Sequence, residues 1–180
     1  MTDQQAGRAD GASAMPVSVP RQFLTFCLAG EVFGIPILSV QEIRGWEPVS
    51  RTPGSAAYVL GVMNLRGSVI PVLDLRVRLG MKPAERTSTS VVIVVRIAAS
   101  DSRAVTVGCL VDGVSDVANV ASEATTPPPA ACGTVDTHFL SGVAAVDKQL
   151  VLLLDVARLV ATPTAGGASR AEAPPSTPDR

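Results

Sequence analysis

Aromatic residues, histidine and cysteine are scarce in this chain, and neither sign of charge is in excess. Aromatics make up 3% of the 180 residues, and His138 is the only histidine, so no histidine-based catalytic triad or multi-histidine metal site can form. The chain carries 15 Lys and Arg against 16 Asp and Glu, a formal net charge of −1. Nucleic-acid-binding proteins present a basic face to phosphates, so this class is disfavoured.

The three cysteines, Cys27, Cys109 and Cys132, are far apart and form no Cys-x-x-Cys motif. Cys27 and Cys109 lie within apolar runs, which predicts small core residues in a reducing compartment. No apolar run is long enough to span a membrane, and the polar start of the chain does not resemble a signal peptide. We therefore expect a cytoplasmic protein that does not insert into membranes, and no metal site.

Short valine-rich segments fill the middle of the chain, and β-branched residues favour strands. Three pairs of these segments flank turn signals, which predicts hairpins at residues 23–35, 62–73 and 91–111, the last with its turn near 100–102. A further strand is expected at residues 150–154. Helical signals are few: one or two turns at residues 37–43 and short stretches after Asp74 and Asp155. The pattern predicts an all-β fold.

The chain repeats itself internally. A shift of 81 positions places Tyr58 on Phe139 and residues 69–75 on residues 150–156. A shift of 74 places residues 34–43 on 108–117. The shift increases from 74 to 81 between these two aligned regions, and the stretch where it changes contains a Pro-rich loop at residues 125–131. Two matched β-units, at roughly 23–80 and 90–160, are therefore predicted.

Each unit alone is too small to bury a full core, and small sheets avoid exposed edges by closing into barrels. We expect two small barrels side by side with a groove between them, within a folded region at residues 21–162. The barrel that the first strand joins stays open. Residues 1–20 and 163–180 are rich in small and polar residues and in proline, which predicts disordered tails.

Asp74 and Asp155 occupy equivalent positions, as the two aspartates of a two-lobed aspartic protease do. That chemistry needs an Asp-Thr-Gly or Asp-Ser-Gly turn so that the carboxylates share a proton, whereas Leu75 and Val156 follow here. We expect each aspartate to cap the helical turn after it, with a hydrolase as the alternative. No glycine pattern matches a phosphate or dinucleotide loop, so no cofactor and no small-molecule substrate are predicted.

One hairpin tip differs between the two repeats. Residues 64–67 (Asn-Leu-Arg-Gly) fall on residues 145–148 (Ala-Val-Asp-Lys) under the shift of 81. Gly67 permits the positive φ of a tight turn, which leaves Arg66 projecting either as a solvated turn residue or as a partner contact. Val40 and Ile43 have helical spacing that suits a core face, with Glu42 exposed between them.

Four motifs together make a resemblance. They are VQEIRGW at 40–46, GVMNLRG at 61–67, IPVLDLR at 70–76 and VDGVSDV at 111–117. In order and spacing they closely resemble the CheW family of chemotaxis coupling proteins, over residues 22–160. The resemblance implies two five-stranded SH3-like barrels packed side by side.

The resemblance also implies a non-catalytic adaptor. CheW-like proteins bridge the helical hairpin tips of chemoreceptors to the regulatory domain of the histidine kinase CheA, in membrane-associated arrays. A receptor hairpin in the groove between the barrels fits helix-in-groove recognition. A pilus or surface-sensing pathway remains as open as flagellar chemotaxis, and a nucleic-acid-binding small barrel is a less favoured alternative.

By motif position, the resemblance implies a set of receptor or kinase contacts. Arg66 would supply paired hydrogen bonds to a carboxylate or to helix-end carbonyls, and Gly61 would allow close backbone approach at a partner face. The full set is Val40, Glu42, Ile43, Gly61, Asn64, Arg66, Gly67, Val91, Val114 and Val117.

Overall fold

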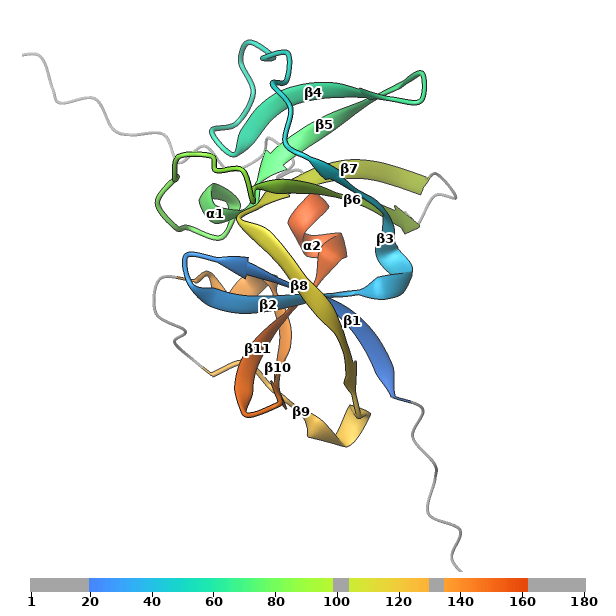
Figure 1. The fold of residues 1–180 in the computed structure, drawn as a ribbon, viewed down its shortest axis with the longest axis vertical. Helices are drawn as coiled ribbons and strands as arrows, with labels where there is room; N and C mark the ends of the chain where they lie inside the picture. The colour runs from blue at the N-terminus through green and yellow to red at the C-terminus, as the bar shows by residue number, and fades with distance from the viewer. Residues whose placement is uncertain (1–19, 99–103, 130–134, 162–180) are drawn as a thin grey trace, which may run out of the picture.

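The computed structural model describes residues 20–98, 104–129 and 135–161, and most of them lie in two β-sheets (Figure 1). The strands are β1 (Arg21–Leu28), β2 (Glu31–Pro36), β3 (Val40–Gly45), β4 (Val59–Leu65), β5 (Ser68–Asp74), β6 (Val91–Ala98), β7 (Ala104–Val111), β8 (Gly113–Val120), β9 (Thr125–Thr126), β10 (Leu140–Val146) and β11 (Gln149–Leu154). The α-helices are α1 (Leu75–Arg78) and α2 (Val156–Val160). Three 3-10 turns are η1 (Ile37–Ser39), η2 (Ser122–Ala124) and η3 (Thr137–Phe139).

The predicted hairpins form where the local turn signals place them. The β1–β2 turn uses Ala29 at φ 54° and Gly30 at φ 86°, both in the left-handed region that tight hairpin turns require. Strands β4 and β5 pair in the same antiparallel manner. Strands β6 and β7 also pair, but the turn expected near residues 100–102 lies outside the described residues.

The helical prediction for residues 37–43 is confirmed only for its first three residues. A single 3-10 turn ends at Ser39, and Val40 begins strand β3. The register places Val40 opposite Val95 and Ile43 opposite Ile93, with an irregularity between Val40 and Glu42. This extra residue gives Val40 and Ile43 a spacing of three on one face, which imitates a helical period within a strand.

The strands form two barrels, and each barrel contains strands from both repeats. The first barrel has the strand order β3-β6-β7-β5-β4, and the second has the order β8-β1-β2-β11-β10-β9. The second therefore exceeds the expected five strands by the two-residue strand β9. Figure 1 shows the barrels one above the other, with α2 between them.

The two repeats exchange their first hairpins. Strands β1 and β2 belong to the first repeat but pair with β8 and β11 in the second barrel, whereas β6 and β7 pair with β3 and β5 in the first. The parallel pairings are equivalent: Val72 lies opposite Gly108, and Leu153 opposite Gly34. Neither repeat therefore closes a barrel by itself. The sequence had predicted one barrel for each repeat.

Three hydrophobic clusters form the core. The largest is shared between the barrels and takes Phe26 and Phe33 from the second, Ile93 from the first and Leu159 from α2. Each barrel also has a smaller core of its own. Cys109 belongs to the shared cluster as predicted, and burial raises the pKa of its thiol to about 12, so that it stays protonated.

Asp74 and Asp155 cap helices, as predicted. The Asp74 carboxylate accepts a hydrogen bond from the Val77 amide (3.3 Å) before α1, and the Asp155 carboxylate accepts from the Arg158 amide (3.1 Å) before α2. Their own amides donate to the carbonyls of the equivalent aromatic residues, Tyr58 and Phe139, at 2.8 Å in both halves. The two repeats therefore make equivalent hydrogen bonds at this point.

Arg78 joins the two halves at their centre. Its guanidinium lies over the rings of Tyr58 (4.3 Å) and Phe139 (4.8 Å), one aromatic from each repeat. It also donates to the carbonyls of Leu159 (3.0 Å) and Ala161 (2.7 Å) at the end of α2. A cation at a helix C-terminus complements the helix dipole, so this arginine stabilises α2 and its contact with the first repeat.

A second arginine ties the exchanged hairpin to the first barrel. The Arg76 guanidinium makes two hydrogen bonds to the Asp112 carboxylate, one of them 2.7 Å long. Asp112 also accepts a bond from the Ala29 amide in the β1–β2 turn (2.8 Å). The hydrogen bond with Asp112 raises the pKa of Arg76, so its guanidinium stays charged at neutral pH.

Several expectations fall on residues that the structure does not describe. These are Cys132, the last two residues of the Pro-rich loop and all of the two predicted tails except Pro20.

Replacing Arg78 by Ala should lower the free energy of unfolding by about 2 kcal/mol, because charged hydrogen bonds and cation–π contacts are lost together. Chemical denaturation would measure this. Arg96, exposed on β6, serves as the control, and its change to Ala should cost no more than about 0.5 kcal/mol. An equal, small loss in both variants would contradict the central role of Arg78.

Replacing Gly61 by Ala should destabilise the fold by about 3 kcal/mol, because a Cβ there would lie 2.2 Å from the Ser50 carbonyl oxygen at a φ of +152°. Gly67 is a matched control: its φ is +88°, but no atom lies within 4 Å of a Cβ. Gly67→Ala should cost only about 1 kcal/mol. Thermal or chemical unfolding of both variants checks the difference, and equal losses would contradict it.

Candidate functional site

Two of the predicted contact residues form an ion pair. Arg66 Nη2 donates to Glu42 Oε2 at 2.7 Å, although the two residues are 24 positions apart in the chain. Glu42 comes from strand β3, and Arg66 from the turn between β4 and β5. The Arg66 side chain is 77% exposed and that of Glu42 20%. The second Glu42 oxygen, Oε1, is buried and has no hydrogen-bond partner within the described part of the chain.

The turn that carries Arg66 is held by its own residues. Gly67 lies at φ 88° and Arg66 at φ 49°, and the Gly67 amide donates to the Asn64 side chain at 2.8 Å. Arg66, Gly67 and Asn64 are all exposed, as the sequence predicted for a projecting tip. We call residues 64–67 the first tip and the equivalent residues 145–148 the second tip.

The second tip has the same backbone. Asp147 and Lys148 lie at φ 48° and 68°, which matches the left-handed pair of the first tip. Because the backbones agree, the two tips differ mainly in side chains: an arginine in one barrel corresponds to an aspartate in the other.

The predicted valines border the shared core. Val40, Val91 and Val114 are all partly buried and pack against the cluster that joins the two barrels. Further along the same strands, Ile43 on β3 is 45% exposed and Val117 on β8 is 40% exposed. An apolar border with two exposed aliphatic side chains therefore follows β3 and β8.

Strand β3 separates the polar part of the site from the apolar part. Ile43 lies opposite Ile93, which belongs to the shared core, whereas Glu42 lies opposite Val94 in the core of the first barrel. Neighbouring side chains of a strand point to opposite faces. The strand is the last of its sheet, so its free edge adjoins both parts.

Gly61 has a role within the fold. It is buried, and the backbone that approaches it closely is that of Ser50, which pairs with Val62 in an isolated bridge. The close approach predicted at a partner face is therefore made inside the chain.

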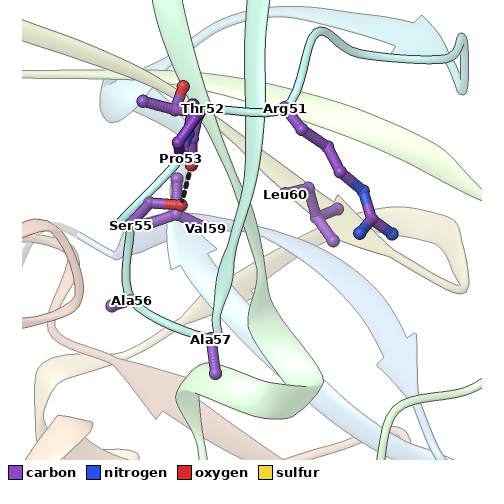
Figure 2. A pocket seen from close by; sticks show the side chains of 8 residues that line it. All are labelled: Arg51, Thr52, Pro53, Ser55, Ala56, Ala57, Val59 and Leu60. Carbon is purple, nitrogen blue, oxygen red and sulfur yellow. Dashed lines mark hydrogen bonds between the residues drawn. The ribbon is translucent and has the colours of Figure 1, made fainter.

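A hollow of ≈460 Å³ lies beside this bridge, and no sequence motif predicted it (Figure 2). The loop between β3 and β4 and the start of β4 form it, and Ser55 Oγ donates to the Thr52 carbonyl at 2.8 Å across the loop. Figure 2 shows the Arg51 side chain extending beside Leu60. The hollow is lined by Arg51, Thr52, Pro53, Ser55, Ala56, Ala57, Val59 and Leu60.

The described residues contain no group of three or more His, Cys, Asp and Glu side chains that could hold a metal ion. Asp74 and Asp155 each serve their own helix as caps. No helix among the described residues is long and apolar enough to cross a bilayer.

Comparisons with known proteins agree with these features. The family model for the CheW-like domain matches residues 22–163. The chain is 42% identical to the "Probable chemotaxis protein CheW" of Rhizobium etli over 77% of this chain and 86% of that protein. It is 36% identical to the "Chemotaxis protein CheW" of Klebsiella aerogenes over 87% and 92% of the two chains.

A solved structure shows the same two SH3-like barrels. It is the scaffolding protein TtCheW from Thermoanaerobacter tengcongensis, with a TM-score of 0.71 at 27% identity. The match covers 87% of this chain and 96% of that one. Proteins of this kind are scaffolds and carry out no catalysis. The chain belongs to the CheW family of chemotaxis scaffold proteins.

Proposed function

We propose that this protein is an adaptor that couples chemoreceptors to a CheA-type histidine kinase, with the free edge of β3 at the centre of a docking face. The observation that carries the proposal is the Glu42–Arg66 pair, because two residues chosen by motif position meet at 2.7 Å on the surface. Arginine is enriched at protein interfaces, and the exposed aliphatic side chain of Ile43 follows Glu42 on the same strand.

The site has the two components that helix-in-groove recognition requires. Val40, Ile43, Val114 and Val117 offer aliphatic surface along β3 and β8, on which the apolar side chains of a helical hairpin would pack. Arg66 offers a guanidinium whose unused N–H groups can bind a carboxylate or the carbonyls at a helix end. The receptor hairpin or the kinase regulatory domain would supply both kinds of group.

Glu42 would hold Arg66 ready for its partner. Its carboxylate fixes the guanidinium near the strand edge, which lowers the side-chain entropy that docking must remove. The Arg66 side of the pair is 77% exposed, so solvent screens the attraction and the pair adds little to the stability of the fold. The adaptor would catalyse no reaction. It would act in the cytoplasm at receptor arrays by binding two partners at once.

Replacing Arg66 by Ala should weaken receptor-dependent activation of the kinase at least about tenfold in a reconstituted phosphorylation assay, because a charged interface contact is lost. The melting temperature should change little, since the Arg66 side chain is 77% exposed. Arg96→Ala is the control and should leave activation unchanged. If Arg66→Ala unfolds the protein, the tip is structural and Arg66 is not the contact.

Replacing Ile43 by Ala should reduce binding of a receptor hairpin or of the kinase regulatory domain about tenfold, because buried aliphatic contacts at an interface contribute about 1–2 kcal/mol. Titration calorimetry with each partner would measure the change. Val69 on β5 is a matched control, since it is also aliphatic and is 69% exposed. Equal effects of Ile43→Ala and Val69→Ala would count against a docking face on β3.

A further inference from the structure

A hollow of ≈580 Å³ lies where the described part of the chain begins. The start of β1, the end of β2, the 3-10 turn η1 and the end of β8 form it. It is lined by Pro20, Arg21, Gln22, Pro36, Ile37, Leu38 and Asn119. Because Pro20 is the first described residue, the preceding part of the chain arrives directly at this hollow.

Leu38 gives the hollow an unusually exposed apolar side chain. At 98% exposure it is the most exposed large hydrophobic residue in the part of the chain that the structure describes. It lies in η1, which the Val40 amide closes by donating to the Ile37 carbonyl. Pro36 and Ile37 are partly buried beside it, so Leu38 continues an apolar surface. Covering such a surface removes apolar area from water and is favourable.

The polar side chains at the hollow have contacts with other groups of the protein. Gln22 Nε2 donates to Asn119 Oδ1 at 3.1 Å. The guanidinium of Arg21, the one charged residue of the lining, lies over the ring of Phe23 at 5.6 Å. An uncharged, apolar occupant therefore suits the hollow better than a polar ligand, which would lose hydration without gaining free partners.

The five residues before Pro20 match these properties. They read Met-Pro-Val-Ser-Val, and the ten residues that end at Pro20 carry no charge. A residue that precedes a proline favours an extended backbone, which applies to Met15 and Val19. Alternate side chains of an extended segment point to the same side, so Met15, Val17 and Val19 would share one apolar side.

The attachment of this segment to Pro20 favours it over other occupants. An extended chain spans about 3.3–3.6 Å per residue, so Val17 can reach about 10 Å from Pro20. A segment tethered so closely acts at an effective concentration of about 1 mM or more. A second copy of the chain would have to supply the same segment from free solution, at a much lower concentration.

We propose that this hollow is a docking site for residues 15–19 of the same chain. The two valines of the segment would pack on Ile37 and Leu38, and this end of the tail would become ordered on docking. Leu38 lies two residues before Val40, where the docking face on β3 begins, so a partner that extends over Leu38 would have to displace the segment. The inference does not depend on the adaptor function, because the hollow can be filled whatever binds at β3.

The test measures how fast a thiol reagent labels Asn119→Cys in the full chain, with peptide mass spectrometry to separate the new thiol from the three native cysteines. Asn119 lines the hollow and is exposed in the absence of an occupant, so a docked segment should shield it. The tail variant Val17→Ser/Val19→Ser removes two apolar side chains without adding charge, and it should raise the labelling rate at least about fivefold. Gln22→Cys, also exposed at the hollow, serves as a second reporter.

The matched control is Ala12→Ser/Ala14→Ser, which makes two apolar-to-serine changes in the same tail outside the segment and should leave the rate unchanged. A reporter far from the tail, Val69→Cys on β5, should be labelled at one rate with all three tails, since Val69 is 69% exposed in the first barrel. Equal labelling of Asn119→Cys with and without the two valines would show that the hollow is open and would overturn the inference. Protection that disappears on dilution would assign the hollow to a second copy of the chain, and this result would also overturn it.

Discussion

The exchange of hairpins between the two repeats is the constraint on which the rest of this structure depends. Each barrel is completed by a hairpin from the other half, through the parallel pairings of β2 with β11 and of β5 with β7. The strands that cross between the halves bring their inner faces together, so that the largest hydrophobic cluster lies between the barrels. The two barrels therefore form one cooperative unit with a fixed mutual orientation.

That fixed orientation lets an exposed site be well ordered. Arg78 between Tyr58 and Phe139, and Arg76 on Asp112, join the halves through buried or partly buried contacts. The exposed residues of the docking face, Arg66 and Ile43, lie in contrast at a turn and on an edge strand. These exposed side chains make few contacts within the fold, so we expect their replacement to affect partner recognition more than folding.

The candidate site was partly readable from sequence. Gly67 indicated a tight turn, and Arg66 indicated an exposed charge at the tip of that turn, because left-handed turns have strong local residue preferences. The Glu42–Arg66 contact was not readable, since it depends on how the β4–β5 hairpin lies against the edge strand. The structural role of Gly61 was also hidden, because its neighbour Ser50 approaches through a tertiary contact.

Local chemistry in the sequence determined the hairpins, the helix caps at Asp74 and Asp155, the internal repeat and the family. Each of these features depends on residues near one another in the chain, or on short motifs that can be compared residue by residue. Only the tertiary structure decided that residues 40–45 are a strand, that the first strand joins the second barrel and that the repeats exchange hairpins. Those outcomes depend on which distant strand offers the better apolar partner, and spacing along the chain carries no information about that choice.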